Sequence, residues 1–187
     1  MSVSTRDALL KSAEIHLRTK GYAAFSYADL AEEIGIRKAS IHHHFPTKEN
    51  LGEALIRQYG DLFMEKLASL DDMHADPVVR LREYSLLFLA SVNDRLLPLC
   101  GALAAEMAAL PESLQILGRE LLAQQLAWIE QQLVLAAPMH GWAPSKPANE
   151  CARMLLSALE GASFIDWALG PSADPLAAFN HILATLA

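Results

Sequence analysis

The sequence predicts an all-α protein, with an N-terminal three-helix head followed by a larger helical body, about nine helices altogether. Three observations predict this class. Apolar residues recur at helical spacing along the whole chain, with no convincing alternating run. Glycines and prolines divide the chain into segments of helical length. With 52% hydrophobic and 20% charged residues, the 187-residue chain can bury a large core, which excludes a disordered or collagen-like protein.

The first four helices are predicted over residues 5–20, 27–34, 37–44 and 48–70. Ser4, Ser26 and Thr47 stand immediately before three of them, where a hydroxyl accepts from the exposed backbone N–H groups of the first turn. Gly21 and Gly35 follow two of them, as left-handed helix ends require. The sequence therefore marks the ends of the head's helices by itself.

The body is predicted to contain helices over residues 78–95, 101–110, 113–136, 148–169 and 175–186. A polar segment over 71–77 and prolines or glycines between the later stretches separate them. We expect the boundary between head and body inside or just after the fourth helix. The predicted domains are residues 1–50, the head, and residues 51–187, the body.

Charge is distributed unevenly along the chain. Residues 1–50 hold seven Lys/Arg against six Asp/Glu, a net of +1, whereas the remaining residues hold eight against sixteen, a net of −8. An acidic body repels nucleic acid, so any contact with it is expected from the head. Two distant cysteines, no apolar run of about 18 residues and no signal-like N-terminus predict a soluble cytoplasmic protein.

Residues 27–44 have the pattern of a helix-turn-helix. Gly35 makes the tight turn between two short helices, and an apolar wedge packs between them, supplied by Leu30, Ile34, Ile36 and Ile41. In this arrangement the second helix lies in the DNA major groove. Basic side chains there can donate to guanine or phosphate, and a small apolar one can meet a thymine methyl. The candidate DNA contacts are Ser26, Tyr27, Arg37, Lys38, Ala39, Ser40, His42, His43 and Lys48.

Several stretches of the head resemble those of TetR-type transcriptional regulators. They are Gly21-Tyr22, then Leu30-Ala31-Glu32-x-x-Gly35, then Lys38 through Glu49 (KASIHHHFPTKE) with Leu51. The resemblance covers residues 6–55. It implies an all-α homodimer with two heads, a ligand cavity in the body, and repression of a double-stranded DNA operator that a small-molecule effector relieves.

The chain departs from the family pattern at several positions. His42 stands where the family usually has Tyr, Ala39 where it has Gly, and Arg37 where it has Ser. In the first helix, Glu14 and His16 occupy positions that tend to be apolar in the family. The departures at Arg37, Ala39 and His42 concern the base preference of the head more than its fold, and those in the first helix have no functional explanation in the sequence.

Two sets of body residues are candidates for the roles that the resemblance implies. Aromatic and soft side chains at helical spacing suit a hydrophobic effector, although ordinary core packing explains such spacing equally. The candidate pocket residues are Phe88, Cys100, Met107, Trp128, Met154, Phe164 and Trp167. Bulky and small residues mixed over 154–163, together with 175–186, suit a four-helix dimer interface, with intrachain packing as the alternative. The candidate interface residues are Leu155, Ala158, Leu159, Ala162, Phe179 and Ile182.

Three alternatives remain beside a ligand-responsive repressor. Cys100 precedes a predicted helix in a segment similar to one that senses electrophiles or oxidants in a branch of the family, which would make the protein a thiol-switched repressor. A binding module without an effector is the second. An enzyme using the body's pocket is the third, but the sequence has no nucleophile elbow, metal-ligand spacing or phosphate-binding glycine loop. We therefore predict no catalysis and no cofactor. We also predict no metal site, since the adjacent side chains of His42, His43 and His44 point about 100° apart on a helix and cannot share one metal ion.

Overall fold

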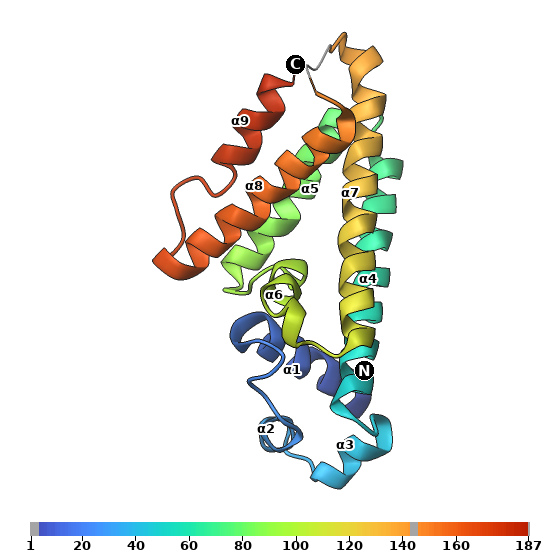
Figure 1. Cartoon of the computed structure of the whole chain (residues 1–187), viewed down its shortest axis with the longest axis vertical. Helices are drawn as coiled ribbons and strands as arrows, with labels where there is room; N and C mark the ends of the chain where they lie inside the picture. Colours follow the sequence, from blue (N-terminus) through green and yellow to red (C-terminus); the bar gives the residue numbers. More distant parts are fainter. Residues whose placement is uncertain (1–3, 143–145, 187) are drawn as a thin grey trace. The chain divides into compact units, whose positions relative to one another are not determined.

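The computed structural model describes residues 4–142 and 146–186, and these are helical without strands (Figure 1). The α-helices in them are α1 (Thr5–Lys20), α2 (Tyr27–Ile34), α3 (Lys38–His44), α4 (Lys48–Met73), α5 (Pro77–Asn93), α6 (Leu99–Ala105), α7 (Glu112–His140), α8 (Ala148–Leu169) and α9 (Ala177–Thr185). A short 3-10 helix, η1 (Met107–Ala109), lies between α6 and α7. The predicted all-α class is confirmed.

The helix starts follow the capping residues in the sequence. Before α1, the backbone N–H of Asp7 donates to the Ser4 hydroxyl over 3.1 Å. Before α2, Ser26 and Asp29 form a reciprocal capping box, in which the Ser26 N–H donates to the Asp29 carboxylate over 2.7 Å. Before α5, the Asp76 carboxylate accepts from the backbone N–H of Val78, the second residue of the helix, over 2.8 Å. These side chains replace the hydrogen bonds that the first turn of a helix lacks.

Several predicted helix boundaries differ from the structure, including the end of the fourth helix, which continues past residue 70 to Met73. The third helix begins at Lys38, with Arg37 at the N-cap position. The helix predicted over 101–110 is instead the separate pair α6 and η1. The helix predicted over 113–136 continues to His140, although Pro138 lies inside it. A proline so near a helix end removes a single backbone hydrogen bond, and the last turn is held from outside, because His140 Nε2 lies 2.9 Å from an Asp76 carboxylate oxygen.

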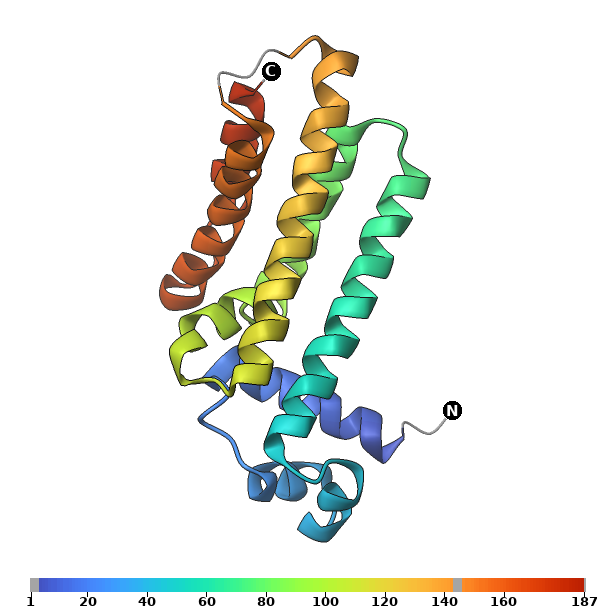
Figure 2. The same cartoon turned by 45° about the vertical axis from the view of Figure 1, so that its right-hand side comes forward.

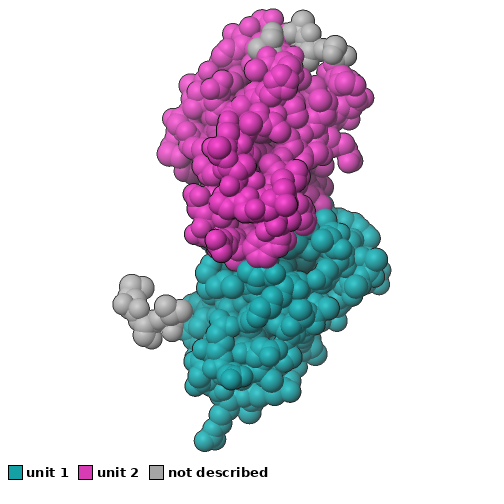
Figure 3. Space-filling model, turned by 90° about the vertical axis from the view of Figure 1, so that its left-hand side faces the viewer, with its two compact units in different colours: residues 1–62, 99–121 teal, residues 63–98, 122–187 magenta. Residues whose placement is uncertain are grey.

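The chain divides into two compact units (Figure 3). Unit 1 consists of residues 1–62 and 99–121, and unit 2 of residues 63–98 and 122–187. Helices α4 and α7 therefore contribute residues to both units. Unit 1 contains more than the predicted head, because α6, η1 and the start of α7 belong to it. A functional division at residue 50 stays a prediction.

Unit 1 is built around buried aliphatic side chains from each of its longer segments. Leu9 of α1, Leu30 of α2 and Ile41 of α3 are fully buried, and α1 packs on both α2 and α6. Gly52 of α4 permits a close approach of α7, since a Cβ there would lie 2.8 Å from Leu114 Cδ1. The short helices of the head are thus supported by residues from the second half of the unit.

Unit 2 has an aromatic core with one internal hydrogen bond at its centre. The ring of Tyr84 lies 5.5 Å from Phe88 and 5.4 Å from Trp128, centroid to centroid. The Tyr84 hydroxyl is buried and donates to Gln125 Oε1 over 2.9 Å, which satisfies a polar group that would otherwise be costly to bury. Around this core α8 packs on α5 and α9, and Figures 1 and 2 show α9 lying alongside α8.

Candidate nucleic-acid interface and ligand cavity

The turn between α2 and α3 has the backbone geometry of a helix-turn-helix. Gly35 ends α2 in the left-handed region, with φ 76° and ψ 34°. A Cβ at this position would meet no atom within 4 Å, so the backbone conformation, and not lack of space, is what favours glycine here. The N–H groups of Gly35 and Ile36 both donate to the Ala31 carbonyl over 3.0 Å. The turn that the sequence predicted is therefore present and closed by hydrogen bonds.

The surface of α3 is almost entirely available to a partner. Ile41 is fully buried and fixes the helix to the head. The predicted DNA contacts on and next to this helix are exposed, namely Arg37, Lys38, Ala39, Ser40, His42 and His43. A helix held by one buried residue, with cations, a hydroxyl and imidazoles around the rest of its circumference, can enter a major groove.

His42 is oriented by two contacts inside the head. Its Nδ1 lies 3.1 Å from the Pro46 carbonyl oxygen, and its ring meets Tyr27 edge-on at 5.0 Å between centroids. Because a carbonyl oxygen only accepts, Nδ1 carries the proton in this arrangement. The Nε2 atom of the neutral ring is then an acceptor. His42 is thereby suited to N–H donors on a base edge, such as the amino groups of adenine and cytosine.

Ser26 and Tyr27 are largely engaged within the head. The Ser26 hydroxyl accepts from the Ala28 N–H over 3.2 Å and donates to Asp29 over 2.8 Å. Tyr27 is buried, its hydroxyl donates to the Phe45 carbonyl over 2.9 Å, and burial raises its pKa to about 12. Both residues position α2 and the end of α3, and their contact with DNA stays a prediction.

The ammonium group of Lys48 performs a role that the sequence analysis missed. It donates to the carbonyl oxygens of Tyr22 and Phe25, and it lies 4.4 Å and 4.3 Å from the centroids of the same two rings. Burial lowers the pKa of Lys48, while Glu106 and Asp29 act in the opposite direction. Lys48 therefore fastens the loop between α1 and α2 to the start of α4, and one N–H remains for a phosphate.

A close polar contact joins α1 to α2 through His16, at a position where the family tends to be apolar. His16 Nε2 lies 2.7 Å from a carboxylate oxygen of Glu33, and the His16 ring stacks on Phe25 at 5.5 Å. One turn away, Arg18 donates to Glu14 over 2.6 Å. His16 and Glu14 thus each have a partner within the head, which gives these two departures a structural role.

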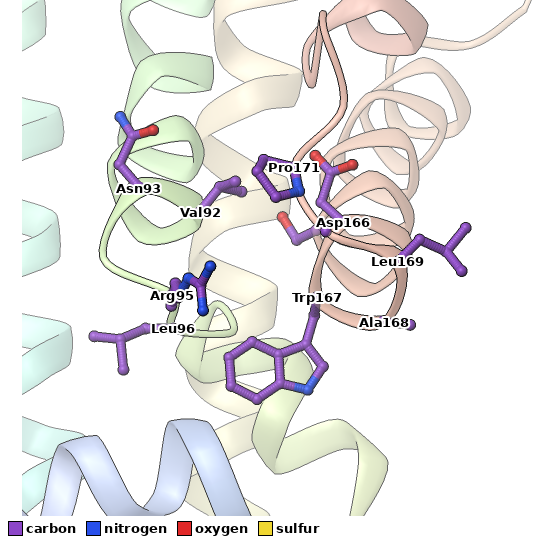
Figure 4. A pocket seen from close by; sticks show the side chains of 11 residues that line it. Val92, Asn93, Arg95, Leu96, Asp166, Trp167, Ala168, Leu169 and Pro171 are labelled. Atoms are coloured by element: carbon purple, nitrogen blue, oxygen red, sulfur yellow. The ribbon is translucent and has the colours of Figure 1, made fainter.

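A hollow of about 520 Å³ lies in unit 2 between the end of α5 and the last turns of α8 (Figure 4). Its lining residues are Val92, Asn93, Arg95, Leu96, Ser163, Asp166, Trp167, Ala168, Leu169, Gly170 and Pro171. Of the residues predicted to form an effector pocket, Trp167 lines it. Arg95 has a φ of 53°, an uncommon backbone conformation for a non-glycine residue. A second, apolar hollow of about 220 Å³ includes Cys151 and Trp142, and the sequence did not indicate it.

The other predicted pocket residues are distributed over both units. Phe88 and Trp128 form part of the aromatic core of unit 2, and the Trp128 indole N–H donates to Asp71 over 3.1 Å. Cys100 and Met107 belong to unit 1. Helical spacing does not distinguish core from cavity wall, since both positions require apolar side chains. An effector contact by these four residues stays a prediction.

The six residues predicted at a dimer interface fall into two groups by burial. Leu155, Leu159 and Phe179 are at most 1% exposed, so they are already covered within a single chain. The half-buried residues are Ala158, Ala162 and Ile182. A helical pattern alone cannot distinguish the face of α8 that meets its own chain from one that meets a second copy. The interface itself stays a prediction.

Other large apolar side chains of α8 are exposed in the single chain. Met154 and Phe164, two of the predicted pocket residues, are 39% and 37% exposed. Ile165 and Leu169 are 59% and 85% exposed. The sequence analysis did not select these last two, although an apolar residue outside the buried stripe of a helix is a recognisable signal. They are available to a partner where the fully buried leucines are not.

The described residues hold no group of three or more histidine, cysteine or acidic side chains with metal-binding geometry. Cys100 and Cys151 are both buried and form no disulfide. None of the described helices combines the length and apolar character needed to cross a membrane.

An exposed second helix that follows a closed turn is the arrangement of a helix-turn-helix regulator. Comparisons with known proteins indicate which family of such regulators the chain resembles. The sequence profile of bacterial regulatory proteins of the tetR family matches residues 9–55, which run from α1 into α4. A TetR transcriptional regulator from Legionella pneumophila has the same fold, with a TM-score of 0.89, 25% identity and complete coverage of both chains. A TetR-family regulator from Agrobacterium tumefaciens gives a TM-score of 0.85 and 29% identity, over 96% of this chain and 93% of that one. Residues 9–55 thus match the tetR family, and the chain as a whole has the fold of TetR-type transcriptional regulators.

The transcriptional repressor KstR2 of Mycobacterium tuberculosis is also similar to this chain. It is 33% identical over 88 residues, which cover 47% of this chain and 42% of KstR2. The chain thus aligns with less than half the length of that curated relative. The likeness is therefore to part of a helix-turn-helix transcriptional repressor.

Proposed function

We propose that the chain is a homodimeric repressor that binds a palindromic DNA operator through residues 1–50 and an effector through residues 51–187. Two copies of α3 would enter successive major grooves about 34 Å apart, or somewhat more. The observation that carries this proposal is the exposure of α3, in which Ile41 alone is buried while the polar side chains around it are exposed. The surrounding head is held by internal hydrogen bonds and is therefore pre-organised for docking.

The effector part of the proposal is supported by the hollow in unit 2. A small, largely hydrophobic molecule that binds one state of the dimer more tightly than the other shifts the population between DNA-competent and incompetent states. The proposed location is the cytoplasm, where both DNA and small metabolites are accessible, and the proposed action involves no catalysis.

Selection of bound sequences from a random duplex pool tests the DNA-binding proposal. We expect a palindromic consensus at controlled salt, because a two-fold dimer reads two equivalent half-sites. Lys38→Ala should weaken binding of that consensus by about 1–3 kcal/mol and leave the melting temperature unchanged. Lys66→Ala, an exposed cation of α4 in unit 2, is the matched control and should bind normally. Absence of any consensus from the wild-type pool would overturn the proposal.

A thiol switch at Cys100 is a weaker candidate. Cys100 is the second residue of α6 and is 3% exposed, and reactive cysteines are usually accessible. We expect Cys100→Ser to release the operator in response to an effector as the wild type does. If electrophiles release the wild type from the operator but do not release Cys100→Ser, the thiol switch is favoured over an effector bound in the cavity.

A further inference from the structure

The turn that ends α5 has an arginine where helix ends of this kind usually have glycine. The Arg95 N–H donates to the Val92 carbonyl over 3.0 Å. The Leu96 N–H donates to the Ser91 carbonyl over 2.9 Å, which completes the hydrogen-bond pattern of a Schellman helix end. Arg95 takes the left-handed position of this pattern, and among the described residues it alone has a positive φ without being glycine. Strained residues of this kind concentrate at ligand sites, so the strain directs attention to the Arg95 side chain.

The guanidinium of Arg95 is a cation without a partner in the lining of the larger hollow of unit 2. Arg95 is exposed and lines that hollow, and its side chain makes no ion pair or hydrogen bond with any described residue. Figure 4 shows it extending from the turn after α5 into the space between α5 and α8. A guanidinium presents its N–H donors in a planar fork that matches the two oxygens of a carboxylate. The hollow therefore offers a binding group for an anion.

The acid in the same lining is occupied within the chain. Arg95 and Asp166 are the charged residues that line the hollow. Asp166 is 7% exposed, and it accepts from the Ser172 N–H over 3.1 Å and from the Ser172 hydroxyl over 3.3 Å. The carbonyls at the end of α5, whose partial charge disfavours an anion, accept the N–H groups of the turn itself. The exposed charge of the lining is thus positive.

The rest of the hollow suits an apolar group. The indole of Trp167 is 41% exposed and lines the hollow from α8 (Figure 4). Val92, Leu96 and Pro171 add apolar side chains from the two helix ends. A volume of about 520 Å³ lies within the range of small-molecule sites, which combine mainly apolar walls with a few polar groups. A ligand with one anionic group and an apolar body matches both parts of this lining.

We propose that unit 2 binds an organic carboxylate, whose charged group pairs with Arg95 and whose apolar body lies in the hollow against Trp167. This inference rests on the proposed function and gives the chemical class of its effector. A carboxylate accepts charge-assisted hydrogen bonds from both arms of the guanidinium, whereas a neutral molecule of the same shape forms weaker ones.

Titration calorimetry on the DNA-free protein tests the inference. The probes are decanoate and 2-naphthoate, each compared with its primary amide, which has nearly the same shape but no charge. We expect at least one carboxylate to bind about tenfold or more tighter than its amide, as a charge-assisted contact predicts. Arg95→Met should remove that preference. Arg82→Met, which replaces an exposed arginine of α5 outside the lining, should keep it.

Arg95→Gly separates ligand binding from folding. Glycine adopts a positive φ without strain, so this variant should melt at or above the wild-type temperature and still lose the preference for the carboxylate. A preference retained in Arg95→Gly or Arg95→Met, or absent from the wild type with both probes, would overturn the inference. Since the calorimetry uses no DNA, failure of operator selection would leave this result standing. Conversely, a normal operator consensus with no Arg95-dependent carboxylate binding would refute the effector class alone.

Discussion

The backbone N–H of Ala23 donates to Glu106 Oε2 over 3.3 Å, across 83 residues of sequence. The same carboxylate fills the space beside Gly21, where an added Cβ would overlap Glu106 Oε1. Both contacts lie within unit 1, where they join the residue that follows α6 to the loop between α1 and α2. The head's first loop is therefore shaped by a side chain from the later half of the chain.

Gly21→Ala should destabilise the protein by about 2 kcal/mol, because φ there is +89° and the new methyl displaces Glu106. Gly141→Ala is the matched control, since its φ is +67° but no atom lies within 4 Å of the added Cβ. Urea unfolding of both variants separates backbone strain from displacement of the carboxylate. If the two variants lose the same free energy of unfolding, displacement of the Glu106 carboxylate does not contribute to the loss.

Lys48→Met should lower stability by about 1–2 kcal/mol, because it leaves two backbone carbonyls of the head without their donor. It should also weaken operator binding. If the third N–H contacts a phosphate, the slope of log affinity against log salt falls by about one. Lys38→Met provides the comparison, with weaker binding and unchanged unfolding. Unchanged stability in Lys48→Met would contradict the inference that Lys48 stabilises the loop between α1 and α2.

His42→Phe should relax the operator consensus at one position per half-site, at a cost of roughly 1–3 kcal/mol for the preferred base. The reason is loss of the Nε2 acceptor, while the edge contact with Tyr27 is retained. Repeating the duplex selection with this variant measures the effect. Nitrogen NMR of the wild-type ring gives an independent check, because a proton on Nε2 of the neutral ring would contradict the assigned tautomer.

Stability should fall as pH rises from about 4.5 to about 7, through the titration of Glu160. Its pKa is raised from 4.5 to about 7 in the folded protein, so the folded state holds a proton that the unfolded state releases in this window. Its contribution is lost as the pH passes the folded pKa, by up to about 3 kcal/mol. Glu160→Gln should therefore gain stability relative to the wild type above pH 7, and Glu150→Gln should not. A stability difference between Glu160→Gln and the wild type that does not change with pH would refute this prediction.

Local features of the fold could be predicted from the sequence. The bounds of α1 and α2 agree with their predicted ranges, because capping residues and glycines act within a few residues of the ends that they mark. The exposed face of α3 was predictable for the same reason, since Gly35 and Ile41 fix the turn and the buried side of a short helix.

Long-range contacts were not predictable in this way. The partners of Lys48 and Glu106 lie more than 20 residues away in sequence, and no local pattern identifies them. Likewise, helical spacing placed Leu155 among candidate interface residues, although it is buried within one chain. Periodicity specifies that a face is apolar, but the packing of the other helices decides what covers it.

The division of unit 1 into two stretches, residues 1–62 and 99–121, affects how the protein is made. During synthesis the head leaves the ribosome first, but Glu106 and Leu114, which contact its loop and α4, are translated later. The DNA-binding unit therefore gains its full set of contacts only after residue 121 has been added. A nascent chain or a truncated product that stops before α6 lacks these contacts, so we expect the head to reach its full stability only after part of the body has been made.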